Sequence, residues 1–324
     1  MKRGYLLLVL LISAFLIPAS GCESEEYKAI ELIPAGANLI AGIQIDRIIS
    51  DQDIIDTYND MEKEPDQPQT FDEALDKLFE ESGIDIKDFS NALVFADTSD
   101  TEQMAYFGFI AEGNFDEDEF IKNIEKNTGE EFLTSDYKEH KLYTNENEDA
   151  SFTFLNDKML LGGTPDAVKD SIDVITGDRQ PVEDELLDAY KRYDNALVSL
   201  AMIVPEDAQD AFTGDSMIGE MPISMDAFSS IDIIGFSVDK DRETFSSRIE
   251  FHFLEADSVQ DAHDTISGMI SMFKGMMEEP ELKEFLGNIE VFISGSWLTI
   301  ALEMELSQIE ELMEMAGDNP MMDF

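Results

Sequence analysis

Short apolar runs recur along the chain, and several of them are joined in pairs by polar turn residues. Such runs predict strands, and the turn dipeptides Asn156-Asp157 and Gly295-Ser296 predict tight hairpins because these residues tolerate a positive φ. The expected strand segments are 37–45, 91–113, 151–163, 196–204, 231–256 and 290–304.

Amphipathic runs, with apolar residues every three to four positions, follow these segments and predict helices. Thr164 and Pro165 fit the cap and the first position of one such helix, and Gly177 fits its end. Helices are expected near 70–82, from Asp116, at 165–176, from Ser258 and from Ser307.

The order strand, helical segment, hairpin, helix, hairpin, helix occurs twice, at a shift of about 140 residues, and predicts an internal duplication. Because hairpin-linked strands pair antiparallel, the predicted fold class is α+β, with two related domains that each have helices packed on one face of a sheet. The predicted boundaries are 1–21 for a signal peptide, 22–32 for an acidic tether, 33–178 for repeat 1, 179–192 for a linker, 193–317 for repeat 2 and 318–324 for a tail.

The N-terminus is typical of a targeting signal. Lys2 and Arg3 precede an apolar run, Leu6 to Ile17, that is shorter than the ~20 residues of a membrane span. The stretch Ala19-Ser20-Gly21-Cys22 resembles a lipobox. This resemblance implies cleavage before Cys22, lipid attachment to its sulfur, and anchoring at the extracytoplasmic face of the cell membrane. The alternative is an ordinary secretory signal followed by an unrelated cysteine.

The chain has 72 acidic residues against 21 Lys and Arg, which gives a formal net charge of −51. Such a charge repels phosphates, so we expect no nucleic-acid partner and only diffuse binding of cations. Since the apolar periodicity is intact, we interpret the charge as a solvent-facing coat. Salt screens the self-repulsion of such a coat, which suits a salt-adapted protein in a saline exterior.

Residues with catalytic or metal-binding chemistry are sparse. His140 is expected in an exposed polar loop, His252 on the solvated face of a strand and His263 in a helix, and their spacing fits no metal site. The only cysteine is Cys22. We therefore expect no catalytic residue, no metal, no cofactor and no enzyme activity. A hydrolase that uses paired carboxylates is a less favoured alternative.

Methionines gather towards the C-terminus, from Met269 to Met322. Methionine is adaptable and occurs both in cores and at promiscuous binding surfaces, so the ligand-binding residues stay unknown. Trp297 is expected beneath a helix, with ligand stacking as the alternative. A groove lined by Met and Phe, which would carry a lipid or another hydrophobic ligand, is the alternative function that these residues favour.

Two stretches resemble a known family: IPAGANLIAGIQID at 33–46 and GGTPDAVKDSIDVITG at 162–177. Together with the duplicated layout, they are similar to uncharacterised extracytoplasmic lipoproteins that contain a domain of unknown function. Pro34-Ala35-Gly36-Ala37 matches the strand entry typical of that family. The resemblance supplies no catalytic residues. The predicted function is therefore a membrane-anchored extracytoplasmic lipoprotein, a non-catalytic binding or accessory module for an unknown ligand or protein.

Overall fold

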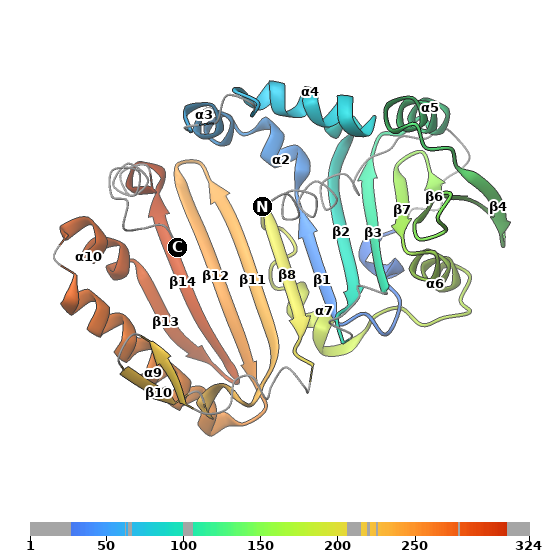
Figure 1. Ribbon diagram of the computed structural model, residues 1–324. Helices are drawn as coiled ribbons and strands as arrows, with labels where there is room; N and C mark the ends of the chain where they lie inside the picture. Colours follow the sequence, from blue (N-terminus) through green and yellow to red (C-terminus); the bar gives the residue numbers. More distant parts are fainter. Residues whose placement is uncertain are drawn as a thin grey trace. The chain divides into compact units, whose positions relative to one another are not determined.

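The computed structural model describes residues 27–61, 63, 67–99, 106–205, 215–218, 221–224, 226–277 and 279–309. The chain divides into two compact units, unit 1 (Met1–Leu187) and unit 2 (Asp188–Phe324). Both units combine helices with antiparallel strands, which confirms the predicted α+β class (Figure 1). The signal peptide, Cys22 and the predicted tail lie outside the described residues.

The sheet of unit 1 has the strand order β1-β2-β3-β7-β6-β5-β4, and every neighbouring pair is antiparallel. Its strands are β1 (Leu39–Ile43), β2 (Phe89–Asp97), β3 (Tyr106–Gly113), β4 (Leu133–Tyr137), β5 (His140–Thr144), β6 (Ser151–Asn156) and β7 (Met159–Gly163). Its helices are η1 (Ala29–Leu32), α2 (Ile45–Ser50), α3 (Gln52–Asp60), α4 (Phe71–Ser82), η2 (Ile86–Asp88), α5 (Glu117–Thr128) and α6 (Pro165–Ile175).

Helices cover both faces of the unit 1 sheet, whereas the sequence predicted them on one face. Successive residues of a strand point to opposite faces, so Phe109 and Ile110 of β3 mark the two faces. The Phe109 face forms a core with residues of α2, α4 and α5. Ile110 on the other face is 0% exposed, and both α6 and η1 pack against β3. The reason is the continuous apolar run of β3, which needs cover on both sides.

Helices α4 and α5 have the caps that fix their ends. The side chains of Thr70 and Asp116 each accept a hydrogen bond from a backbone N–H of the first turn, and Gly83 and Gly129 end the helices in the left-handed conformation. A Cβ on Gly83 would lie 2.5 Å from the backbone of Asn123 in α5. Glycine at this position therefore lets the end of α4 pack directly against α5.

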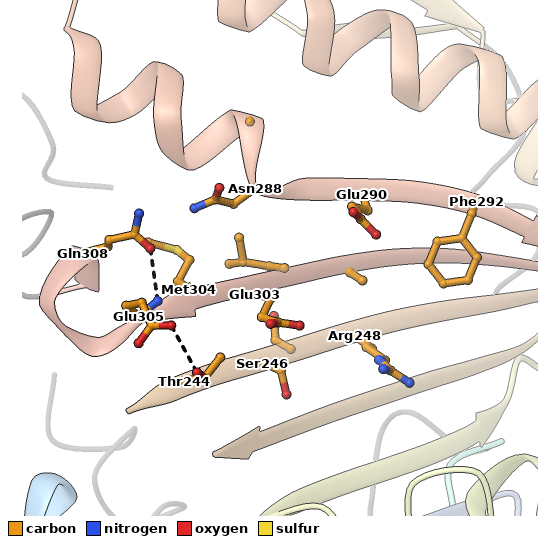
Figure 2. Close-up of a pocket in the computed structure, with 14 residues that line it drawn as sticks. Thr244, Ser246, Arg248, Asn288, Glu290, Phe292, Glu303, Met304, Glu305 and Gln308 are labelled. Atoms are coloured by element: carbon orange, nitrogen blue, oxygen red, sulfur yellow. Dashed lines mark hydrogen bonds between the residues drawn. The ribbon is translucent and has the colours of Figure 1, made fainter. Parts of the chain in front are cut away.

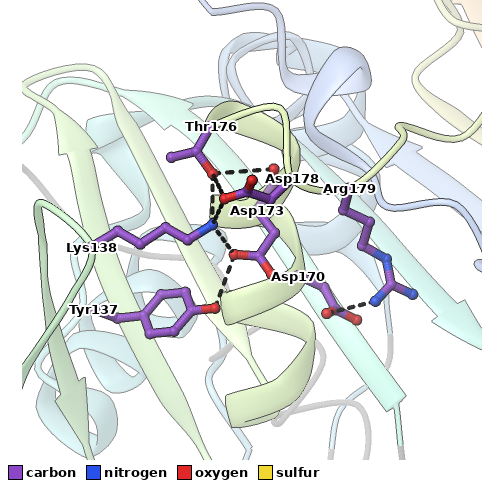
Figure 3. Close-up of polar contacts among 7 residues, drawn as sticks. All are labelled: Tyr137, Lys138, Asp170, Asp173, Thr176, Asp178 and Arg179. Atoms are coloured by element: carbon purple, nitrogen blue, oxygen red, sulfur yellow. Dashed lines mark hydrogen bonds and ion pairs between the residues drawn. The ribbon is translucent and has the colours of Figure 1, made fainter.

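The β4–β5 hairpin was not predicted from the sequence, because β4 is mostly polar and four of its five residues are exposed, so it lacks an apolar strand pattern. Figure 3 shows how its turn is held against the end of α6. Nζ of Lys138 lies 2.5 Å from Oδ1 of Asp173 and 2.6 Å from Oδ2 of Asp178, and it donates to Thr176 Oγ1 at 2.7 Å. These contacts raise the pKa of Lys138 and lower the pKa of Asp178. A cation at a helix C-terminus is also favoured by the helix dipole.

Two segments that were predicted as connections contain packed structure. The helix η1 lies within the predicted tether, and its Ala29 and Leu32 are buried. The predicted linker contains α7 (Asp184–Tyr190), in which Leu186 is 2% exposed, and the boundary between the units falls inside this helix. Apolar side chains in both segments therefore pack into the fold.

The main sheet of unit 2 has the order β13-β14-β12-β11-β8, again with antiparallel neighbours. Its elements are β8 (Val198–Ile203), β11 (Ile231–Asp241), β12 (Thr244–Phe253), α9 (Ala256–Met276), α10 (Pro280–Gly287), β13 (Ile289–Ser294) and β14 (Trp297–Glu305). A separate hairpin, β9 (Asp215–Ile218) with β10 (Met221–Ser224), and the turn η4 (Asp226–Phe228) lie between β8 and β11 in the chain. Read in the opposite direction, the order is β8-β11-β12-β14-β13. Strand by strand in chain order, it matches β1-β2-β3-β7-β6 of unit 1.

Helix α9 packs on one end of the apolar face of the unit 2 sheet, where Phe253, Ile266 and Leu298 join one core. Further along the same face, apolar residues are only half-buried, and Ile249 is 37% exposed. We call this part the open apolar face. Its residues are Val198, Leu200, Met202, Phe236, Val238 and Ile249.

Within the described ranges, none of the helices has both the length and the apolar character needed to cross a membrane.

Asp88 gives unit 1 a pH-dependent stability. Burial, followed by the charges of Asp85 and Glu119, raises the pKa of Asp88 from 3.8 to about 6. A raised carboxyl pKa stabilises the fold at low pH, and this contribution is lost as the pH rises from about 4 to about 6. After allowance for solvent screening, Asp88→Asn should raise the free energy of unfolding by about 1 kcal/mol near pH 7.5 and by almost nothing near pH 3.5.

Denaturant unfolding at the two pH values measures this difference. Asp136→Asn, which removes a charge from an exposed position of β4, is the control for general relief of repulsion. Equal stabilisation by the two variants near neutral pH would contradict the assignment to Asp88.

Candidate functional site

Alternate residues of three neighbouring strands give unit 2 a polar sheet face, opposite the apolar one. In register, Arg248 of β12, Ala301 of β14 and Glu290 of β13 form one row across it. We call this surface the polar face. Its residues are Thr244, Ser246, Arg248, Glu250 and His252 of β12, Trp297, Thr299, Ala301, Glu303 and Glu305 of β14, and Glu290 and Phe292 of β13.

Glu250 is the buried acid of the polar face, with 4% of the residue exposed. Its Oε2 accepts a hydrogen bond from the Tyr193 hydroxyl at 2.6 Å and lies 2.6 Å from Nη2 of Arg192. A carboxylate that leaves water requires such partners, because an unpaired buried charge is costly. Arg192 and Tyr193 come from the segment directly after α7, so Glu250 holds this segment on the sheet.

Gly235 of β11 makes room for this arrangement. It lies opposite Glu250 in the strand register. A Cβ at position 235 would lie 2.5 Å from the Tyr193 hydroxyl oxygen and 2.7 Å from Cε2 of its ring. The tyrosine therefore rests on the bare backbone of β11, and from there its hydroxyl reaches Glu250.

Trp297 is not beneath a helix, as the sequence predicted, but lies in this polar cluster. The Arg192 guanidinium carbon stands 4.4 Å from the centre of the indole ring, which is cation–π geometry. The centre of the His252 ring lies 4.9 Å from the centre of the indole ring, and Nδ1 of His252 lies 2.7 Å from Asp232 Oδ1. We call Arg192, Tyr193, Glu250, His252 and Trp297 the Glu250 cluster.

The phenols of this region serve as neutral hydrogen-bonding groups. Burial, and then the hydrogen bond to Glu250, raises the pKa of Tyr193. Burial also raises the pKa of Tyr190 to about 12, and its oxygen accepts a hydrogen bond from the Ser199 hydroxyl at 3.2 Å. Neither tyrosine ionises near neutral pH. The charges and donors of the Glu250 cluster are thus directed at one another, and the cluster fixes structure.

A groove of about 490 Å3 lies on the other end of the polar face, and Figure 2 shows its lining. Ala301 lines it between Arg248 and Glu290 in the strand register, and its methyl group is small beside these two side chains. Phe292 and Glu303 also line it. Its volume is within the range of small-molecule sites, about 300–1,000 Å3. We call it the Ala301 groove.

One end of the Ala301 groove is formed by the polar residues Asn288 and Gln308. Asn288 follows α10, and Gln308 follows β14. Gln308 is fixed, since its Oε1 accepts from the Glu305 backbone N–H at 3.1 Å and its Nε2 donates to Glu284 Oε1 at 2.8 Å. The Thr244 hydroxyl donates to Glu305 Oε1 at 3.3 Å. The end of the groove near Gln308 is therefore preorganised.

Charged groups at the centre of the groove are not used by the fold. Among the described residues, no ion pair within 4.0 Å joins Arg248, Glu290 or Glu303 to another side chain. Phe292 is 43% exposed beside them. A guanidinium, two carboxylates and an aromatic ring can contact a ligand without first breaking an internal pair. This set was not predicted from the sequence, although alternation along β12, β13 and β14 places its members on one face of the sheet.

The three histidines lie apart from the Ala301 groove. His140 is not in an exposed loop, as predicted, but begins β5, where burial lowers its pKa. His252 is on the predicted strand face and belongs to the Glu250 cluster, and His263 lies in the predicted helix with Nδ1 3.0 Å from Asp264 Oδ1. Over the described ranges, no three His, Cys, Asp or Glu side chains are grouped to hold a metal ion.

Comparison with known proteins gives a likeness of fold. No protein-family model and no curated protein matches the sequence. Crystal form III of TP0453 matches with a TM-score of 0.49 at 6% identity, covering 90% of this chain and 99% of that one. Crystal form IV matches with a TM-score of 0.47 at 7% identity, covering 89% and 97%. At these values the likeness carries no information about function.

The Glu250 cluster makes a prediction about stability. Glu250→Gln keeps the size of the side chain and an acceptor for Tyr193 but removes the charge that pairs with Arg192. We expect the free energy of unfolding to fall by about 1–3 kcal/mol, and the fluorescence of Trp297 to shift as Arg192 loses its anchor.

Chemical denaturation followed by the fluorescence of the single tryptophan measures both effects. Glu303→Gln is the matched control on the same face, where we expect a change below about 0.5 kcal/mol. Similar losses in the two variants would show that Glu250 has no special role.

Proposed function

We propose that the protein is a lipoprotein anchored through Cys22 at the extracytoplasmic face of the cell membrane, and that it acts as a non-catalytic binding module. The observation that supports the anchor is the sequence of the first 22 residues, in which a short apolar run is followed by small residues and the only cysteine. The matching strand order of the two units supports their origin by duplication.

The contrast between the two halves of the polar face supports the binding role. The Glu250 cluster satisfies its own charges, so it is suited to hold the sheet and the segment after α7 in one arrangement. Beside it, the Ala301 groove offers charged groups without internal partners. A rigid scaffold next to open charged groups favours recognition of a polar ligand, because little must be reorganised on binding.

The open apolar face supports a second candidate, the carriage of a lipid or another hydrophobic ligand. Leu200, Phe236 and Ile249 lie side by side across β8, β11 and β12, and Ile249 is 37% exposed. A contiguous, partly exposed apolar surface is a recognised mark of an interaction site. The residues of this surface lie between Val198 and Ile249 and include one methionine, Met202, so the methionines of the C-terminal region are not part of it.

Cys22→Ala tests the proposed anchor. We expect the wild-type protein in the membrane fraction, and the variant, once its signal peptide is cleaved at another position, released into the soluble extracytoplasmic fraction. Mass spectrometry of a digest of the purified wild-type protein should show lipid mass on the peptide that begins with Cys22. Identical fractionation of the two proteins, or an unmodified Cys22, would contradict the anchor.

Native mass spectrometry of the intact wild-type protein separates the two candidate ligand types. A lipid that remains bound to the polypeptide, beyond the covalent anchor, would favour carriage on the open apolar face.

A further inference from the structure

We propose that the Ala301 groove binds a basic α-amino acid, with the ligand carboxylate on Arg248 and its ammonium groups on the glutamates. This inference rests on the proposed binding role and names the class of ligand. Its basis is a hollow on the polar face that is lined by charged groups of both signs, of which Arg248, Glu290 and Glu303 form no ion pair with another described residue.

The strand register places Arg248 and Glu290 on opposite sides of Ala301, in the same row and one strand away from it in each direction. Neighbouring strands lie ~4.8 Å apart, so the backbones of Arg248 and Glu290, which are two strands apart, are separated by roughly 10 Å. Long side chains on the two sides can therefore meet a small molecule above the alanine, with a cation contact on one side and an anion contact on the other.

Arg248 selects for a carboxylate in an otherwise acidic groove. Guanidinium groups bind carboxylates through two parallel hydrogen bonds, which a simple amine lacks. Across Ala301 from Arg248 stands Glu290 of β13, and Glu303 of the central strand β14 is a diagonal neighbour of both residues. Glu290 and Glu303 offer two carboxylates to an ammonium group. Phe292 adds an aromatic ring on which methylene groups or an ammonium group can pack.

The total charge favours a basic amino acid over a neutral one. Three glutamates and one arginine line the groove, which gives it a formal charge of −2. Glu305 lies two residues beyond Glu303 on the same strand face, so it extends the acidic side away from Arg248. A ligand with one carboxylate at one end and a second cationic group on a flexible side chain matches this order of charges.

Diffuse attraction to the acidic coat is the competing explanation, and it makes opposite predictions. A net charge of −51 attracts any cation, and a dication more than a monocation. Diffuse attraction is screened by salt, whereas contacts in a groove are screened less. Cadaverine is L-lysine without its carboxylate, so it has a larger positive charge but no group for Arg248.

Isothermal titration calorimetry on the purified full-length chain tests the proposal, with L-lysine and cadaverine as probes. L-Lysine should bind one to one and stay saturable when salt is raised from about 0.15 M to 0.5 M, while cadaverine binds at least about tenfold more weakly. Arg248→Gln should lower the affinity for L-lysine about tenfold or more without lowering the affinity for cadaverine. Glu290→Gln should lower the affinity for both probes.

Glu131→Gln is the control, since it removes the same charge from an exposed residue of unit 1. All variants must keep the wild-type melting temperature, so that a loss of binding is not a loss of folding. Tighter binding of cadaverine than of L-lysine, equal effects of Glu131→Gln and Glu290→Gln, or no saturable binding of L-lysine would each overturn the proposal. None of these outcomes bears on the anchor at Cys22, which fractionation tests separately.

Discussion

A carboxylate that is removed from water has to be surrounded by charged or hydrogen-bonding groups, and Glu250 imposes this requirement on unit 2. Tyr193 and Arg192 meet it from the segment after α7, and Gly235 leaves the space that Tyr193 occupies. The position of Arg192 in turn places a cation over Trp297. One buried charge thus determines how the start of unit 2 packs on its sheet.

The polar face divides its charges into two groups with different roles. In the Glu250 cluster each charged or polar group has a partner within the protein, so this end of the face is rigid and its polar groups are not offered to a ligand. In the Ala301 groove the charges of Arg248, Glu290 and Glu303 have no partner among the described residues. The strand register brings the two groups onto one face of β12 and β14, two residues apart at Arg248 and Glu250. The closed end holds the backbone that positions the open end.

The sequence predicted the hairpins and several helices because these depend on local signals, such as the turn Gly295-Ser296 and the start of α5 at Asp116. It did not predict the polar β4–β5 hairpin, which relies on contacts of Lys138 with the end of α6. The alternation in β12 placed His252 on the polar face correctly. The Ala301 groove was not predicted, because Arg248 and Glu290 flank Ala301 only through the pairing of β12 with β14 and of β14 with β13. Pairing between distant segments leaves no local signal.

A crystal structure of the protein grown with L-lysine tests the central claim most directly, namely that the polar face combines a fixed cluster with an open groove. The account predicts ligand density above Ala301, with its carboxylate on Arg248 and an ammonium group on Glu290, and with the contacts of Glu250 to Tyr193 and Arg192 intact. A structure in which the ligand lies elsewhere, or in which Arg192 leaves Glu250 for the groove glutamates, would contradict it.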